Sequence, residues 1–392
     1  MNDDSGSAIP NTFSPPYNLF SVTDRPREPL SSTNELDTLL LPHHSVAVAK
    51  ELTSVARALV SPRGKGIYAT DESPDVIEGM LSAASLNGQE NLNEEEKKDR
   101  RRKWREAAYG ALTNDHISGV ILYPETLLDF KLGETLTKKG IILGVRAHGE
   151  LAPFPASPFE FIVQGLDDLL PKLQAARAAG ARFSKWRAPI ACTSEALGLP
   201  STVSLEVQAE TLAVFASISQ QAGLVPIVEP DVEFSADADL YRSVEVHQKA
   251  IRMIYTRCLE HGVLLEASLI KPSFPQPGLK HPSRKTITSE EIALATASVI
   301  ANSVPASVPG VVFLSGGLEP SVAMKYLSGV NALVNKAGPS SPFSRLPPLS
   351  FSYGRALQGE AMKHWVRGDT QAMKNAFDNA TKGCSDAAKG EY

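Results

Sequence analysis

Lys271 has the clearest chemical potential in this chain, because it closes a mostly apolar run, EASLIKPS (266–273), immediately before Pro272. A lysine inside a buried strand is unfavourable because its ammonium loses water, and proline then ends the strand by removing a backbone donor. The pattern therefore predicts that Lys271 is the last residue of a strand. As a neutral amine it could attack a ketone, and loss of water would give an iminium that draws electrons from the adjacent carbon–carbon bond.

This chemistry needs neighbours that control protons. A free lysine, with a pKa near 10.4, is almost fully protonated at pH 7, whereas desolvation and a second cation such as Lys185 favour the neutral amine. The order of the predicted strands makes Glu229 the nearest candidate for the shuttle that removes water. A structural ion pair between Lys271 and Glu229 is the alternative, and these two residues alone favour that alternative.

Two glycine-containing turns could bind a phosphate. SGG (315–317) and YGR (353–355) follow the last two predicted strands, where barrel enzymes often bind phosphate. Glycine lets backbone N–H groups close on an anion, and the guanidinium of Arg355 can bind it bidentately. The two turns together favour a phosphorylated substrate.

The segments that would position these residues alternate between two periodicities. Eight short apolar runs are typical of strands: 66–73, 118–126, 140–147, 182–189, 224–231, 264–272, 310–317 and 349–356. Helical spacing lies between them, most clearly at 205–223 and 240–262, and each of these two segments ends near a glycine suited to a helix C-cap. The alternation predicts a (β/α)8 TIM barrel, an α/β fold with a parallel eight-stranded core.

Polar residues gather at the ends of the predicted strands. They are Asp71, Arg146, Lys185, Arg187, Glu229, Asp231, Lys271, Ser315 to Gly317, and Gly354 with Arg355. One buried charge at a strand end is more often a satisfied ion pair than a catalyst. Charges at six or more such ends predict an active site instead, because the carboxyl rim of a barrel is its common active-site face.

The rest of the composition excludes several classes of function. The net charge of −5 argues against general nucleic-acid or acidic-membrane binding, and no run reaches the roughly 18 apolar residues of a membrane span. We interpret the basic run KKDRRRKWR (97–105), which follows three glutamates, as a solvated helix face. Three widely spaced cysteines predict reduced thiols in an intracellular protein.

Metal and redox chemistry find little support in the sequence. Of the eight histidines, only His148 lies at a predicted strand end, and none forms a ligand cluster, so no metal site is predicted. No dinucleotide fingerprint is present, so no cofactor is predicted.

Taken in order, several segments resemble the class I fructose-bisphosphate aldolases. The similarity runs from about residue 45 to the C-terminus. It is carried by GKGIYATDES (64–73), QGLDDL (164–169), KWR (185–187), VPIVEP (225–230), LIKP (269–272), FLSGG (313–317) and FSYGRALQ (351–358), with Tyr392 as the last residue.

The resemblance implies a role for each matching residue. Lys271 would be the Schiff-base lysine, and Lys185 and Glu229 would assist carbinolamine formation and dehydration. Asp71 would handle the hydroxyl proton during C3–C4 cleavage, and Tyr392 would be a mobile C-terminal tyrosine that exchanges a proton with the enamine. The implied substrate-binding residues are Ser315, Gly316, Gly354 and Arg355 at the dihydroxyacetone-phosphate phosphate, with Arg187, Arg146 and Ser73 elsewhere on the substrate.

The chain departs from the family pattern on one side of the site. Arg146 stands where the family usually has a lysine, and Asp231 replaces a usual glutamate. In DESPDVIEGML (71–81), Gly79 and Met80 replace a Lys-Arg pair and Val76 replaces a serine. In the family these positions lie around the distal phosphate, the one farther from the ketone. Ketose-phosphate chemistry is therefore better supported than tight recognition of a second phosphate.

We therefore expect a cytoplasmic lyase of glycolysis or gluconeogenesis that reversibly cleaves fructose 1,6-bisphosphate to dihydroxyacetone phosphate and glyceraldehyde 3-phosphate. One alternative is a Schiff-base aldolase that uses dihydroxyacetone phosphate with a different or relaxed aldehyde acceptor. The other is a non-catalytic scaffolding protein on the same fold. We expect residues 1–42 to form a flexible arm and 43–392 a single barrel domain with the C-terminal tail, and the resemblance implies a homotetramer.

Overall fold

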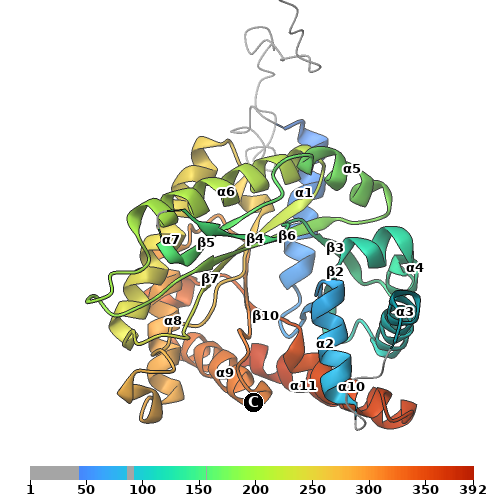
Figure 1. The fold of residues 1–392 in the computed structure, drawn as a ribbon. Helices are drawn as coiled ribbons and strands as arrows, with labels where there is room; N and C mark the ends of the chain where they lie inside the picture. Colours follow the sequence, from blue (N-terminus) through green and yellow to red (C-terminus); the bar gives the residue numbers. More distant parts are fainter. Residues whose placement is uncertain (1–43, 86–91, 156) are drawn as a thin grey trace, which may run out of the picture. The chain divides into compact units, whose positions relative to one another are not determined.

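Eight parallel strands form a closed barrel in the computed structural model, which describes residues 44–85, 92–155 and 157–392 (Figure 1). Around the barrel the order is β1-β10-β9-β8-β7-β6-β3-β2. The strands are β1 (Gly66–Thr70), β2 (Ile117–Leu122), β3 (Ile142–Arg146), β6 (Phe183–Ile190), β7 (Val225–Val232), β8 (Leu269–Ile270), β9 (Val311–Phe313) and β10 (Leu349–Tyr353). Each lies within or overlaps a predicted run, and the predicted TIM barrel is confirmed. The predicted arm, 1–42, lies outside the described residues.

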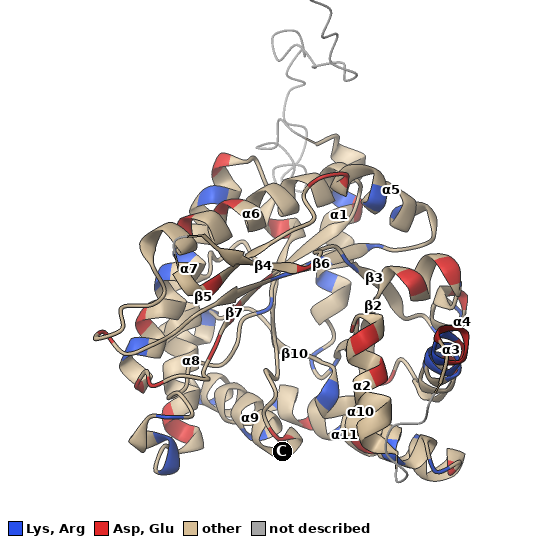
Figure 2. Ribbon diagram, in the orientation of Figure 1, with Lys and Arg blue, Asp and Glu red and all other residues tan. Residues whose placement is uncertain are grey.

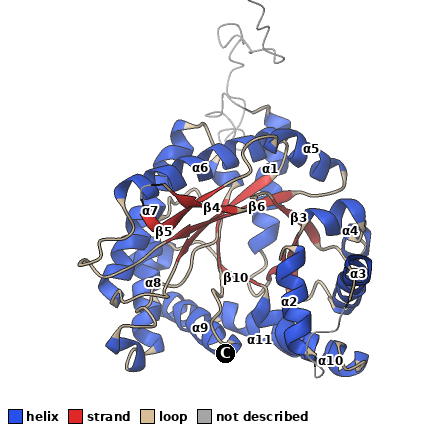
Figure 3. Ribbon diagram, viewed as in Figure 1, coloured by secondary structure: helices blue, strands red, loops and turns tan. Residues whose placement is uncertain are grey.

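Helices connect the strands and lie around the barrel (Figure 3). They are α1 (Val46–Val60), α2 (Pro74–Ala84), α3 (Glu94–Ala111), α4 (Gly133–Thr137), α5 (Leu169–Ala178), α6 (Thr202–Gln221), α7 (Leu240–Glu260), α8 (Ser289–Ser303), α9 (Pro320–Lys336), α10 (Arg355–Trp365) and α11 (Thr370–Lys389). The two helices that the sequence indicated most clearly are α6 and α7. Gly223 and Gly262 follow them with φ of 76° and 67°, the left-handed conformation that ends a helix.

The strands that carry the polar residues are aligned at their carboxyl ends. β6 and β7 pair from Phe183 with Val225 to Ile190 with Val232, which sets Arg187 opposite Glu229. Arg146 at the end of β3 is the register partner of Lys185. Because alternate residues of a strand point to the same face, this register brings the charged side chains of three strands to one mouth of the barrel.

Strand β8 is shorter than the predicted run 264–272. A 3-10 turn occupies Leu265–Ala267, and the strand itself is only Leu269–Ile270. Gln220 of α6 explains the difference, because its side chain donates to the carbonyls of Leu264 and Ala267 and accepts from the N–H of Leu264. These backbone groups therefore bond to a helix side chain rather than to a neighbouring strand.

The basic run 97–105 was interpreted only partly correctly. It lies in α3, which begins with a capping box between Asn93 and Glu96, and Figure 2 shows acidic and basic residues together along this helix. Exposed i,i+4 pairs such as Lys103 with Asp99 match the prediction. However, Trp104 and Arg105 are buried, and the ring of Trp104 packs against Trp365 of α10 and Phe377 of α11, so the helix is not solvated all round.

An antiparallel hairpin that the sequence did not indicate follows β3. Its strands are β4 (Leu151–Phe154) and β5 (Ser157–Val163), paired with an irregularity between Pro153 and Phe154. Prolines at 153 and 158 masked the alternation, since proline within a run argues against a strand. The hairpin matters for the site because its first residues border the barrel mouth.

Close packing inside the barrel requires glycine at one strand position. A Cβ on Gly144 of β3 would lie 2.2 Å from the ring of Phe183 on β6. Cys192, Cys258 and Cys384 are free and buried. Within the described residues, no helix is long and apolar enough to cross a membrane.

Candidate active site

A cavity of about 560 Å³ opens where the carboxyl ends of the strands meet. It is lined by most of the residues singled out in the sequence: Asp71, Ser73, Arg146, Lys185, Arg187, Glu229, Asp231, Lys271, Ser315, Gly316, Gly354 and Arg355. Of the predicted site residues, only Tyr392 lies elsewhere. The carboxyl rim therefore gathers side chains that are up to 284 positions apart in the chain, from Asp71 to Arg355.

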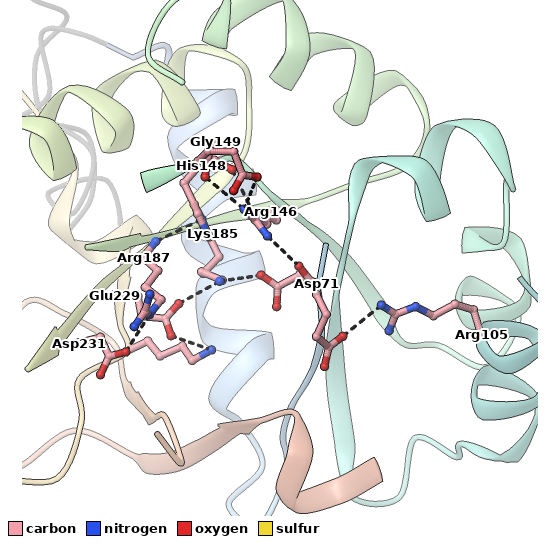
Figure 4. A network of polar contacts seen from close by, with 12 residues as sticks. Asp71, Arg105, Arg146, His148, Gly149, Lys185, Arg187, Glu229 and Asp231 are labelled. Atoms are coloured by element: carbon pink, nitrogen blue, oxygen red, sulfur yellow. Dashed lines mark hydrogen bonds and ion pairs between the residues drawn. The ribbon is translucent and has the colours of Figure 1, made fainter. Parts of the chain in front are cut away.

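Four charged side chains form the centre of the cavity: Lys185, Glu229 and Lys271 are buried, and Asp71 is partly buried (Figure 4). The ammonium of Lys185 lies 2.6 Å from a carboxylate oxygen of Asp71 and 3.0 Å from Oε2 of Glu229. The ammonium of Lys271 lies 3.2 Å from Oε1, the other oxygen of Glu229. Glu229 thus bridges two lysines that are each about 5% exposed, so a proton can pass between Lys271 and Glu229 without leaving the cluster.

The charges of the cluster set one another's protonation. Burial alone would raise the pKa of Asp71, but Lys185 and Lys271 outweigh it and hold that pKa well below its usual range. The same balance of burial against the two lysines lowers the pKa of Glu229. Burial tends to lower the pKa of Lys185, yet Asp71 and Glu229 raise it overall. At neutral pH Asp71 and Glu229 are therefore carboxylates and Lys185 is an ammonium.

Lys271 is the first residue after β8, one position beyond the strand end, whereas the sequence predicted it to be the last residue of the strand. Its backbone N–H donates to the carbonyl of Val228 on β7 at 2.8 Å, which fixes the start of its side chain. The residue is 4% exposed yet lines the cavity. Pro272 comes next, and the chain leaves the barrel.

A second ion pair lies beside the cluster. The Nε of Arg187 lies 2.7 Å from Asp231, and its Nη2 lies 3.7 Å from Glu233. Burial lowers the pKa of Arg187, but Asp231 and Glu229 more than compensate. The guanidinium is about one third exposed, so it keeps donors free for a substrate oxygen.

The glycine turns after β9 and β10 form a cradle beside Lys271. Gly316 and Gly317 have φ of 56° and 83°, and successive left-handed residues aim backbone N–H groups at a common point. A Cβ on Gly354 would lie 2.7 Å from the carbonyl of Ala69, so only glycine lets β1 and the start of α10 approach this closely. Arg355 begins α10 and is exposed. In the described part of the chain its guanidinium makes no ion pair or hydrogen bond.

The opposite end of the cavity is lined differently. Arg146 donates to the backbone carbonyls of His148 (3.1 Å), Gly149 (3.1 Å) and Asp71 (3.4 Å), as Figure 4 shows. Its guanidinium also lies over the ring of Tyr123. Val76, Met80 and Leu151 add apolar side chains to the lining of the cavity, and the resemblance places Val76 and Met80 on its distal-phosphate side.

Comparisons with known proteins show which family this chain belongs to. The family model for class I fructose-bisphosphate aldolase, a glycolytic enzyme, matches residues 51–392. Human fructose-bisphosphate aldolase B is 35% identical over 88% of this chain and 91% of its own length. The Drosophila melanogaster fructose-bisphosphate aldolase is 36% identical over 87% and 91%. The chain belongs to the class I fructose-bisphosphate aldolases.

A solved structure agrees with this assignment. The aldolase from Plasmodium falciparum, determined in complex with TRAP and a small-molecule inhibitor, aligns with a TM-score of 0.79 and 33% identity. The alignment covers 89% of this chain and 96% of that chain. Membership makes the protein a lyase of the aldolase type, and the predicted family is confirmed.

Tyr392 is the site residue that this aldolase structure does not bring to the cluster. The residue is 50% exposed, and its backbone N–H donates to the hydroxyl of Ser328 at 3.1 Å. It lines a separate cavity of about 830 Å³ between α9, α10 and α11, which shares Arg355 with the main cavity. A role for Tyr392 thus requires its side chain to move, and that role stays a prediction.

Glu72 and His148 line the cavity of this aldolase, and neither was assigned to the site from the sequence. Glu72 accepts hydrogen bonds from Arg105 of α3 (3.1 Å) and from Gln358 of α10, and so ties the segment after β1 to both helices. His148 follows β3 and borders Lys185 and Arg187. Glu72 stands next to Asp71, and its position in the chain gave no sign of these distant partners. His148 did stand at a strand end, which was a usable signal.

Proposed function

We propose that this chain cleaves fructose 1,6-bisphosphate reversibly to dihydroxyacetone phosphate and glyceraldehyde 3-phosphate, through a Schiff base on Lys271. The observation that carries the proposal is the contact of Lys185 and Lys271 with the two oxygens of Glu229, in the same cavity as Arg355, which has no ion pair in the described part of the chain. A structural ion pair would not need this cavity or the cradle. The named relatives are fructose-bisphosphate aldolases.

Formation of the Schiff base uses the three central residues. Lys271 gives up a proton and attacks the ketone carbon of the sugar, and Lys185 supplies positive charge to the oxygen that becomes a hydroxyl. Glu229, which contacts both amines, carries the protons that convert this hydroxyl to leaving water. The product is an iminium between Lys271 and the former ketone carbon.

Carbon–carbon cleavage then requires a base at the C4 hydroxyl. Asp71 is deprotonated at neutral pH, because the lysines lower its pKa, and it takes this proton. The C3–C4 bond electrons move into the iminium and give an enamine, while the C4 oxygen becomes the carbonyl of the departing aldehyde. Tyr392 protonates the enamine, and hydrolysis then releases dihydroxyacetone phosphate.

The remaining lining residues bind the substrate. Ser315, Gly316, Gly354 and Arg355 hold the phosphate next to the ketone. Arg187, Ser73 and Arg146 contact the rest of the sugar, with Arg146 toward the distal phosphate. We place the reaction in glycolysis and gluconeogenesis in the cytoplasm. We assign catalysis to the barrel domain, and the resemblance supports a homotetramer.

A second candidate is an aldolase with the same phosphorylated donor and a relaxed aldehyde acceptor. Two observations favour it: the apolar Val76, Met80 and Leu151 line the cavity, and Arg146 is hydrogen bonded to backbone carbonyls. Such an enzyme would distinguish poorly between aldehydes with and without a phosphate.

Borohydride reduction tests the chemistry directly. Treatment of the protein with dihydroxyacetone phosphate and borohydride should attach one stable adduct at Lys271, and intact-mass measurement with peptide mapping would locate it. Lys271→Met is the matched control, because Glu229 keeps its pairing with Lys185 and the variant should fold without forming the adduct. An adduct on another lysine of active protein would refute the Schiff-base assignment, and no adduct together with no turnover would favour a scaffolding protein.

A further inference from the structure

His148 lines the cavity, and only one of its two ring nitrogens is hydrogen bonded within the described residues. Its Nδ1 accepts the backbone N–H of Arg187 at 3.3 Å (Figure 4), and its ring lies 6.2 Å from that of the buried Trp186. An acceptor nitrogen carries no proton, so the ring proton of the neutral imidazole resides on Nε2. Nε2 has no hydrogen-bond partner among residues 44–85, 92–155 and 157–392, although His148 lines the cavity.

The surroundings keep the imidazole neutral. Burial lowers the pKa of His148 well below its usual range, and the nearby charges of Lys185 and Arg146 lower it further. Protonation would also place an N–H on Nδ1 against the N–H of Arg187. His148 is therefore a fixed, uncharged N–H donor in a cavity whose other side-chain donors are mostly cations.

The barrel order shows which part of a sugar His148 would meet. The order β1-β10-β9-β8-β7-β6-β3-β2 places β9, which leads to the phosphate cradle, across the barrel from β3, which leads to His148. A ketose with its C1 phosphate in the cradle and its C2 on Lys271 of the adjacent strand must extend across the mouth toward β3. The atoms beyond C3, which become the aldehyde, then lie on the side of His148.

We propose that Nε2–H of His148 donates a hydrogen bond to the C4 oxygen, which is a hydroxyl in the ketose and the carbonyl oxygen of the aldehyde. Asp71, whose charge acts on His148, removes the proton from this same oxygen during cleavage. In the reverse reaction the bond polarises the aldehyde carbonyl toward attack by the enamine, and the proton stays on Nε2 throughout. The assignment rests on the proposed function and adds a residue specific to the aldehyde half-reaction.

Two variants distinguish the role of Nδ1 as an acceptor from the role of Nε2 as a donor. His148→Asn ends near the level of Nδ1, so its amide oxygen can still accept the N–H of Arg187, but it removes the donor at the Nε2 position. His148→Gln reaches the Nε2 position with an amide N–H. A donor that contacts the reacting oxygen predicts that the Gln variant retains most of the activity that the Asn variant loses.

The decisive readout compares two half-reactions. Exchange of the C3 proton of dihydroxyacetone phosphate with solvent, followed by NMR, needs the enamine but no aldehyde. His148→Asn should leave this exchange within about two-fold of wild type. It should lower kcat/KM for cleavage, and for condensation with glyceraldehyde 3-phosphate, by about five-fold, the contribution of one neutral hydrogen bond. Condensation with propanal, which has a carbonyl but no hydroxyl or phosphate, should fall by a similar factor.

Each other result overturns the assignment. Equal losses in exchange and condensation would mean that His148 only positions Lys185 and Arg187, and an unchanged condensation rate would mean that Nε2 contacts no reacting atom. Loss with glyceraldehyde 3-phosphate but not with propanal would move the contact away from the C4 oxygen. A wild-type protein without exchange or borohydride adduct would instead refute the proposed function itself.

Discussion

The two ends of the cavity use arginine in opposite ways. At the cradle, Arg355 is exposed beside Gly316 and Gly317 and has no hydrogen-bond partner among the described residues. At the far end, Arg146 has a side chain only 12% exposed and donates to three backbone carbonyls. A cation contributes most to anion binding when its donors are free. Both arginines follow strands closely, but within the described residues only Arg355 has its donors available. The position of an arginine in the sequence therefore does not predict how well it can bind a phosphate.

The largest loss of kcat/KM is expected when Arg355 is replaced. Arg355→Ala should lower kcat/KM for fructose 1,6-bisphosphate and fructose 1-phosphate alike, because both sugars present a phosphate next to the ketone. A charge-assisted bidentate contact contributes about 1.5–3 kcal/mol, so the loss should be about 10- to 150-fold. Steady-state kinetics on both sugars measures it. Arg367→Ala removes an exposed arginine that does not line the cavity and should leave both values unchanged, whereas a loss confined to the bisphosphate would exchange the roles assigned to the two ends.

Much of this contrast could not be predicted from the sequence. The apolar runs and the polar residues at their ends were sufficient to predict the barrel and most of the residues that line the cavity. Hydrophobic periodicity can be read from short segments, and the active sites of barrels lie at the carboxyl ends of the strands. The bonding of Arg146 depends on how the chain turns at His148 and Gly149 into a hairpin whose prolines concealed its strands.

Other features missed by the sequence share this cause. Gln220 shortens β8 by bonding to residues 44 and 47 positions away, and Gln358 reaches Glu72 across 286 positions. The buried face of α3 likewise depends on what packs against it. Contacts between residues far apart in the chain produce no periodic pattern in the sequence, so these contacts could not be predicted from it. The position of Tyr392 in a separate cavity is of the same kind.

A smaller and more selective effect is expected at the far end. Arg146→Ala should lower kcat/KM for the bisphosphate by about five-fold and leave fructose 1-phosphate within two-fold, since most donors of this guanidinium are already used and little of the usual charge-assisted contact remains. Three carbonyls would lose a donor, so the melting temperature should also fall by a few degrees. Arg146→Lys keeps the charge and is the control. Equal weakening of both sugars would assign Arg146 to the common catalytic machinery.

The comparison can also be tested by adding a free cation to the apolar end. Met80 lines the cavity, and its neighbour Gly79 does not. Met80→Arg should therefore raise the preference for bisphosphate over monophosphate by about three-fold, the contribution of a partly solvated ion pair. Gly79→Arg is the matched control, because a Cβ there meets nothing within 4 Å and the new charge would lie outside the cavity. An equal gain from both variants would show long-range attraction rather than a contact with the phosphate.

The smallest effect should follow removal of metal ions. Arginine and lysine side chains line the cavity, and the described residues include no group of three or more His, Cys, Asp or Glu side chains placed to hold a metal ion. Polarisation of the ketone is assigned to Lys271 and Lys185, whose charges need no metal. Preincubation with EDTA should therefore leave cleavage of both sugars unchanged within error. Loss of activity that zinc restores would mean that a metal ion polarises the substrate, and the comparison between the two arginines would then have to include it.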